Sequence, residues 1–116
     1  MNAILTTIDK THSSVLDGTH PHILGTMKAK AANGILKEGL LVAKDSSGDL
    51  VAYNPLGVSP VTLVVAVLIH DIDTASDDAA VVIKHGTVNK AKLLVGSAAP
   101  DAADIAALEA KTIYAL

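Results

Sequence analysis

Short apolar runs alternate with tight polar turns through the middle of this chain, from Leu40 to Val95. The runs are rich in leucine and β-branched residues, and Gly, Asn, Asp and Pro separate them. Runs of this kind between turn-forming residues are typical of β-strands. The pattern therefore predicts a meandering, mostly β domain, and few reactive side chains interrupt it.

The composition limits the core that this domain can build. The 116 residues fit one domain. Phe and Trp are absent, and Tyr53 and Tyr114 are the two aromatic residues, so the apolar residues are mostly Ala, Val, Leu and Ile. Half of the residues are hydrophobic and 18% are charged, against about 25% charged in an average soluble chain. We therefore expect exposed apolar surface, which favours a homo-oligomer.

Charge and hydropathy argue against several partner classes. The net charge is −3 and every basic residue is a lysine; without Arg, the bidentate contacts typical of nucleic-acid recognition are missing. The longest apolar run, Val61–Ile69, is much shorter than the ~20 residues that span a bilayer, and it predicts a central strand buried on both faces. No signal-peptide pattern is evident. We expect neither nucleic acid nor membrane as a partner, and the chain has no cysteine for disulfides.

The first 24 residues differ from the remainder. They are rich in Thr, Ser and His, which predicts an extended N-terminal arm that is mobile in the free protein. An ordinary frayed terminus is the alternative interpretation. The β-capable run Ala3–Ile8 could pair with a strand elsewhere. The predicted organisation is thus an arm over residues 1–24 and a β-rich domain over residues 25–116.

Several local patterns define elements of the domain. Alternating apolar and lysine residues predict a first strand over Thr26–Ala31. Asp45–Asp49 is expected to connect a hairpin, with Gly48 at the positive φ that such loops need. Pro100, with Asp101 and Asp104 after it, predicts the start of a helix.

Ile105 and Leu108 mark the inner face of that helix, and Ile113–Leu116 predicts a last strand. The predicted fold class is α+β, mostly β: a compact, small meander or barrel-like β domain with one short C-terminal helix and a flexible N-terminal arm.

Two groups of residues resemble metal sites. His20 and His22 flank a proline, but no third ligand lies nearby in sequence, although folding could bring His12, His70 or His85 close. The acidic run from Asp71 to Asp78 departs from the EF-hand template, because Ala75, Ser76 and Val82 occupy the key positions. A rigid turn and a solvated loop are the favoured interpretations, and we expect no metal site.

The chain also lacks a supported catalytic motif. Ser59 precedes a proline where a nucleophile elbow needs a helix and a glycine. The segment Gly34–Leu40 has the glycine spacing of a P-loop without its Lys-Ser/Thr ending. We therefore predict no catalytic residues, no cofactor and no small-molecule substrate, and hence no enzyme.

The order and spacing of the strands and turns resemble those of lambda-type head decoration, or capsid-stabilising, proteins of tailed bacteriophages and prophages. The resemblance covers roughly residues 23–116. It rests on the segments Gly39–Asp45, Gly48–Tyr53, Ala66–Ile69, Asp71–Thr74 and Val81–Asn89, followed by the helix that ends near Leu108 and by Ile113-Tyr114.

This resemblance implies a late, structural protein of the virion that forms a homotrimer. It would sit on the outer capsid surface at threefold sites of the expanded phage head, after synthesis in the host bacterial cytoplasm. The implied partner is the major capsid protein, with which the N-terminal arm would form a strand. The arm residues expected to bind the capsid are Ala3, Ile4, Leu5, Thr6, Thr7, Ile8, Val15 and Leu16.

Two alternatives stay open at this point. The chain could be another phage structural module, such as a head fibre base or a tail component. It could also be a generic β binding domain.

Overall fold

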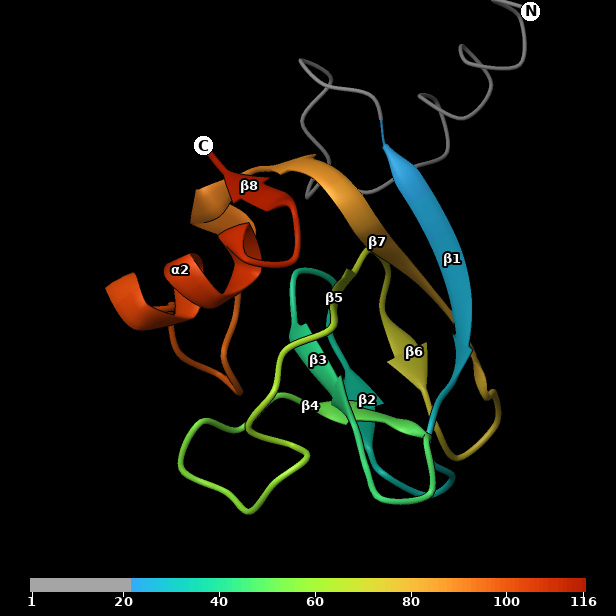
Figure 1. The fold of residues 1–116 in the computed structure, drawn as a ribbon. Coiled ribbons are helices and arrows are strands. Elements are labelled where there is room, and N and C mark those ends of the chain that lie inside the picture. The colour runs from blue at the N-terminus through green and yellow to red at the C-terminus, as the bar shows by residue number, and fades with distance from the viewer. Residues whose placement is uncertain (1–21) are drawn as a thin grey trace, which may run out of the picture.

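The computed structural model describes residues 22–116, which form a mostly antiparallel β fold with a short helix near the C-terminus (Figure 1). This agrees with the predicted fold class. The elements are β1 (Ile23–Lys28), β2 (Ile35–Leu36), β3 (Leu41–Lys44), β4 (Leu50–Ala52), β5 (Ala66–Leu68), β6 (Ile72–Asp73), β7 (Ala79–Val88), the 3₁₀ turn η1 (Lys90–Lys92), α2 (Ala102–Glu109) and β8 (Ile113–Ala115).

The main sheet has the strand order β1-β7-β5-β3-β4, and all of these neighbours are antiparallel. Strand β8 adds to β7 in parallel, and β2 pairs with β6 in a separate two-stranded sheet. The two ends of the main sheet meet where Ala29 bridges Leu50, and the Lys30 N–H donates to the Leu50 carbonyl at 3.0 Å. The sheet is therefore partly closed, which gives the domain its barrel-like character.

Buried side chains pack on both faces of this sheet. Alternate residues of one strand point to opposite faces; Val67 of β5 joins the cluster that contains Leu108 of α2, whereas Leu68 joins the cluster that contains Leu36 and Ile72. The helix thus covers one face, and the β2–β6 pair covers the other.

The predicted hairpin is confirmed. Strands β3 and β4 pair, and Gly48 has φ +87° in the turn between them. The Asp45 carboxylate fixes this turn, since it accepts hydrogen bonds from the backbone N–H groups of Ser47 and Asp49, each at 2.9 Å.

The predicted helix is confirmed as well, and it begins at Ala102, two residues after Pro100. Asp101 is the N-cap, and its carboxylate accepts the Asp104 N–H at 2.9 Å, while the Asp104 carboxylate accepts the Asp101 N–H at 3.0 Å. This reciprocal pair is a capping box. Leu108 on the inner face is fully buried, and Ile105 packs beside the same cluster.

The prediction of one long central strand over Val61–Ile69 is wrong in its first half. Only Ala66–Leu68 form β5, and these residues are buried on both faces as predicted. The preceding residues form turns instead: the Val61 N–H donates to Val58, and the Leu63 N–H donates to Pro60. Local turns formed here because Pro60 has no N–H for a sheet ladder.

Three further differences concern strand boundaries. Strand β1 begins at Ile23 rather than at Thr26, since its pairing with β7 extends the alternating segment. The segment after Asn89 is not a strand but the turn η1, which the Asn89 side chain caps. The acidic segment contains a short strand, β6, whose partner β2 lies far away in sequence.

Candidate functional site

The residues predicted to grip the capsid, Ala3–Ile8 with Val15 and Leu16, lie outside the described residues. The described chain begins beside β7. His22 Nε2 lies 3.2 Å from the Thr87 carbonyl, and Ile23 of β1 is paired with His85. The segment that carries the predicted arm therefore joins the body at the C-terminal end of β7.

The C-terminus of the chain lies at this same end of β7 (Figure 1). Gly86–Val88 of β7 pair with Ile113–Ala115 of β8. Three large apolar side chains are exposed there, which we call the terminal surface: Ile23, Tyr114 and Leu116. Exposed apolar groups that gather at one end of a fold are typical of an interaction surface.

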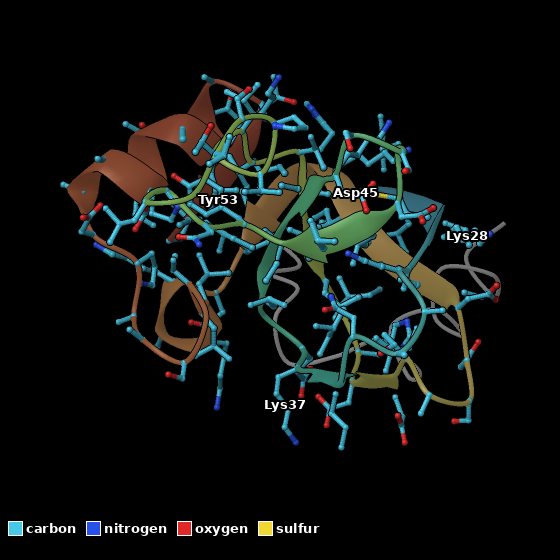
Figure 2. The ribbon with its side chains drawn as sticks, turned by 90° about the horizontal axis from the view of Figure 1, so that it is seen from below. Lys28, Lys37, Asp45 and Tyr53 are labelled. Carbon is cyan, nitrogen blue, oxygen red and sulfur yellow. The ribbon has the colours of Figure 1, made fainter. Side chains whose placement is uncertain are left out.

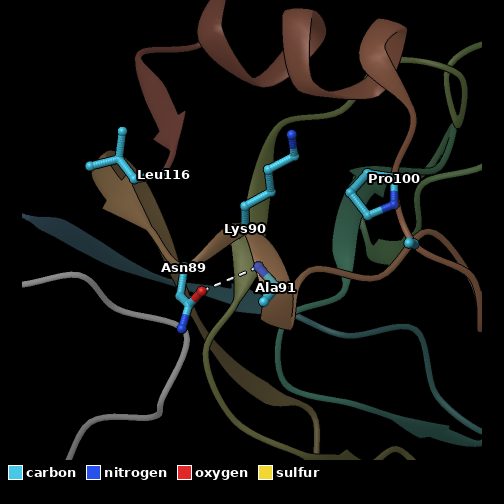
Figure 3. Close-up of a pocket in the computed structure, with 6 residues that line it drawn as sticks. Asn89, Lys90, Ala91, Pro100 and Leu116 are labelled. Carbon is cyan, nitrogen blue, oxygen red and sulfur yellow. Dashed lines mark hydrogen bonds between the residues drawn. The ribbon is translucent and has the colours of Figure 1, made fainter.

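An apolar hollow of about 410 Å³ adjoins Leu116 (Figure 3). Its walls are fixed by hydrogen bonds: the Lys90 N–H donates to the Leu116 carbonyl at 3.0 Å, and the Asn89 side chain accepts the Ala91 N–H at 3.2 Å. The hollow is lined by Asn89, Lys90, Ala91, Ala99, Pro100 and Leu116. We call it the C-terminal hollow. It offers mainly hydrophobic contact, and Lys90 is the one residue of its lining with a charged side chain.

A second exposed apolar feature is the loop between β4 and β5, residues 54–63, which extends from the body at the lower left of Figure 1. We call it the apolar loop. Leu56 is 94% exposed and Val58 is 82% exposed, and Leu63 near its end is also exposed. These are among the most exposed large apolar side chains of the described chain, and neither catalysis nor stability of a monomer accounts for them.

Tyr53 anchors the start of this loop to the helix. Its hydroxyl donates to the Asp104 carboxylate at 3.1 Å, and both side chains are buried. Tyr53 is labelled in Figure 2. Burial, and then the hydrogen bond and negative charge of Asp104, raise the pKa of Tyr53 above its ordinary value. Because the phenol stays protonated, it serves as a stable donor that ties the sheet to α2.

The described histidines have structural partners. His70 Nε2 accepts the Val81 N–H at 2.9 Å, and its Nδ1 lies 2.9 Å from the Asp71 carbonyl, so the ring continues the pairing of β5 with β7. His85 Nδ1 lies 2.9 Å from Thr112 Oγ1. His12 and His20 lie outside the described residues. Within residues 22–116, no group of three or more His, Asp or Glu side chains could hold a metal ion.

The carboxylates of the acidic segment support its turns. Asp73 accepts the Ala75 N–H, and Asp77 accepts the Ala79 N–H, each at 3.0 Å. Asp71 accepts the Glu38 N–H at 2.8 Å. A polar hollow of about 320 Å³ lies over Thr74–Asp78, and one of its two acidic lining residues, Asp77, already accepts a backbone N–H.

The two sequence segments that resembled catalytic motifs have structural roles. Ser59 precedes Pro60 through a cis peptide in the apolar loop, not in a strand-to-helix turn. The segment with P-loop spacing contains β2 and leads into β3 rather than into a helix. Within residues 22–116, no helix is long and apolar enough to span a membrane.

One family of known proteins matches nearly the whole chain. The family described as Bacteriophage lambda head decoration protein D matches residues 6–113. The chain belongs to this family. Head decoration proteins are structural, non-enzymatic components of the phage capsid surface, which they decorate and stabilise. No curated protein matches the chain.

Family membership confirms the resemblance, the structural role and the capsid location predicted for this head decoration protein. A role in an assembly is also consistent with the large apolar side chains that are exposed on the single chain. Sequence reasoning missed the C-terminal hollow, because its lining comes from three separate segments. It also missed the apolar loop, although the uncharged stretch from Leu50 to Ile69 was the available signal.

Proposed function

We propose that this decoration protein acts as a homotrimer at threefold sites of the expanded phage head, and that its N-terminal arm pairs with the major capsid protein. The observation that carries the proposal is the family match over residues 6–113, which extends into the arm segment. Because the family is one of head proteins, a tail component or a generic binding domain is not favoured.

The position of β1 supports the arm mechanism. This strand ends the main sheet, and the predicted arm, residues 1–24, leads directly into it and overlaps its first two residues. The described chain begins at this strand, beside the terminal surface, where Ile23 and Leu116 are exposed. An extended peptide that adds a strand to another protein gains main-chain hydrogen bonds, and its apolar side chains provide anchors.

The energetics favour three arms over one. Each main-chain hydrogen bond contributes a net ~0.5–1.5 kcal/mol, whereas ordering a residue costs ~1–2 kcal/mol. For a single docked arm, the free energy gained from hydrogen bonds nearly equals the free energy lost on ordering. Burial of the anchors Ile4, Leu5 and Ile8 must therefore supply the net binding free energy. Three arms on one trimer add avidity, because the second and third arms bind at a raised effective concentration.

Stabilisation of the head follows from selective binding. A protein that binds the expanded lattice and not the unexpanded lattice shifts the equilibrium toward expansion by linkage, without catalysis. The stabilisation grows with the free concentration of the decoration protein above its dissociation constant.

Deletion of residues 2–15 tests the arm. We expect the shortened protein to keep its oligomeric state and its circular dichroism spectrum, and to lose binding to expanded heads in a co-sedimentation assay. A matched pair of full-length variants tests the anchors alone. Ile4, Leu5 and Ile8 changed to Asp should abolish binding, whereas the same three charges placed at Thr11, Ser13 and Ser14, which are not among the predicted binding residues, should not. Full occupancy of heads by the shortened protein would refute the arm mechanism, and cryo-electron microscopy without density at threefold sites would refute the location.

A further inference from the structure

The C-terminal hollow lies beside the place where the predicted arm joins the body. His22 Nε2 is 3.2 Å from the Thr87 carbonyl, which marks this junction on β7. Asn89, which lines the hollow, follows Thr87 by two residues, and two residues of extended chain span only ~7 Å. A partner that meets the body at the arm junction therefore meets the hollow as well.

Symmetry keeps the junction and the hollow together in the proposed trimer. Rotation about a threefold axis leaves the height of every residue along that axis unchanged, so the three junctions and the three hollows beside them lie at the same level. Because the family decorates the capsid surface and the arms are proposed to pair with the major capsid protein, this level faces the head. The apolar loop, at the lower left of Figure 1, lies away from it.

The hollow is a preformed apolar site. Leu116 forms one wall and is fixed on both sides: its N–H donates to the Val88 carbonyl, and its carbonyl accepts the Lys90 N–H, each at 3.0 Å. Figure 3 shows the Pro100 ring on the opposite side. A cavity of ~150 Å³ with apolar walls holds a benzene molecule, so the volume of about 410 Å³ has room for one large apolar side chain. Fixed walls lose little conformational entropy when such a group enters.

Two lysines place positive charge at the rim of the hollow. Lys90 and Lys92 belong to η1, and both are exposed. Neither ammonium group forms an ion pair with another residue in the range 22–116, and the sequence from Asn89 to Pro100 contains no acidic residue. A partner segment with an apolar side chain next to a carboxylate would therefore match both the walls and the charge of this site.

We propose that the C-terminal hollow receives a large apolar side chain of the major capsid protein, and that a neighbouring carboxylate of that protein pairs with Lys90 or Lys92. The proposal rests on the proposed function, which supplies the partner, and it adds a contact of the folded body to the contact of the arm. Each trimer then holds the head by three arms and three hollows. Weakening of one hollow contact is multiplied across the three copies, because they bind as one linked unit.

Titration of undecorated expanded heads, measured by co-sedimentation, tests this contact. Leu116→Asp places a charge in the apolar wall, and Ala91→Trp fills the hollow, so each should raise the concentration for half-occupancy by about tenfold or more. Leu56→Asp is the matched control, since Leu56 is 94% exposed on the apolar loop, and it should leave that concentration unchanged. Circular dichroism and sedimentation equilibrium check that each variant keeps its fold and its oligomeric state. Wild-type binding by either hollow variant, or equal weakening by Leu56→Asp, would overturn the proposal.

Zero-length crosslinking tests the charge pairing without any substitution. A carbodiimide joins a lysine amine to a carboxylate through an amide bond and is itself converted to a urea. In decorated heads, mass spectrometry should find Lys90 or Lys92 joined to an Asp or Glu of the major capsid protein. Lys44, at the hairpin end of β3, is the internal control and should not be joined to it. Crosslinks from Lys44 and none from Lys90 or Lys92 would place the hairpin end against the head and overturn the proposal.

The arm deletion separates this proposal from the proposed function. If the chain without residues 2–15 no longer binds heads, while the full-length hollow variants bind as the wild type does, the arm mechanism stands and the hollow contact is refuted. If the shortened chain still binds heads, the arm mechanism fails. A further loss of binding on adding Leu116→Asp to the shortened chain would then support the hollow contact, and no further loss would refute it.

Discussion

Replacement of Tyr53 by Phe tests how the helix is held to the sheet. The change removes one hydroxyl, which donates to Asp104 at 3.1 Å between two side chains that are 6% and 5% exposed. A hydrogen bond to a charged group contributes ~1.5–3 kcal/mol. Asp104 would keep its bond from the Asp101 N–H at 3.0 Å, but its other oxygen would lose a donor in a buried position. We therefore expect the free energy of unfolding to fall by ~1.5–3 kcal/mol.

Denaturant unfolding at neutral pH measures this loss, with protein concentrations matched so that association contributes equally. Thermal unfolding should show a midpoint lower by ~6–12 °C for a chain of this size. Tyr114→Phe is the control, because that ring is 38% exposed, and we expect it to change stability by less than ~0.5 kcal/mol.

A double-mutant cycle with Asp104→Ala isolates the bond. If the reasoning holds, Tyr53→Phe costs much less in the Asp104→Ala background than in the wild type. An equal cost in both backgrounds would show that the hydroxyl stabilises the fold by some contact other than Asp104. That result would refute the reasoning.

Three further predictions concern stability. The fold raises the pKa of the Tyr53 hydroxyl, so the unfolded chain releases this proton first as pH rises above ~10. Above that pH the free energy of unfolding should therefore fall more steeply for the wild type than for Tyr53→Phe. Parallel pH profiles of the two proteins would contradict this. Gly48→Ala should lower the free energy of unfolding, measured with denaturant, by ~1–2 kcal/mol. Gly48 has φ +87° and an added methyl group would meet no atom within 4 Å, so backbone strain alone contributes. Ser47→Ala is the control, and equal stability of the two variants would contradict the prediction. Leu108→Ala should cost ~2–5 kcal/mol, because this side chain is fully buried where α2 meets the sheet; a calorimetric loss below 1 kcal/mol would mean that the helix is not part of the core.

Local chemistry made several elements predictable. The hairpin turn at Asp45–Asp49 and the helix start at Asp101 depend on residues within four positions of each other, so their signals are complete in the sequence. The two halves of the apolar run Val61–Ile69 could not be distinguished in this way. Its last part became β5 because β3 and β7 flank it, whereas residues 61–63 lie in turns that local hydrogen bonds close.

The candidate surfaces divide similarly. The arm residues were found from composition and from the family resemblance, and their contacts stay a prediction. The C-terminal hollow could not be found from the sequence, because its lining is contributed by residues near position 90, near position 100 and at the C-terminus. Such a set has no spacing that a single sequence reveals.

The sequence by itself determined that this protein is a small β domain with a surface role, because alternating strands and turns, scarce charge and missing catalytic motifs are properties of neighbouring residues and of composition. Only the tertiary structure decided which apolar side chains remain in water. Burial depends on long-range pairing: Val67 and Leu68 lie between strands and are enclosed, while Leu56 and Val58, equally apolar, lie on a loop that no other described element covers.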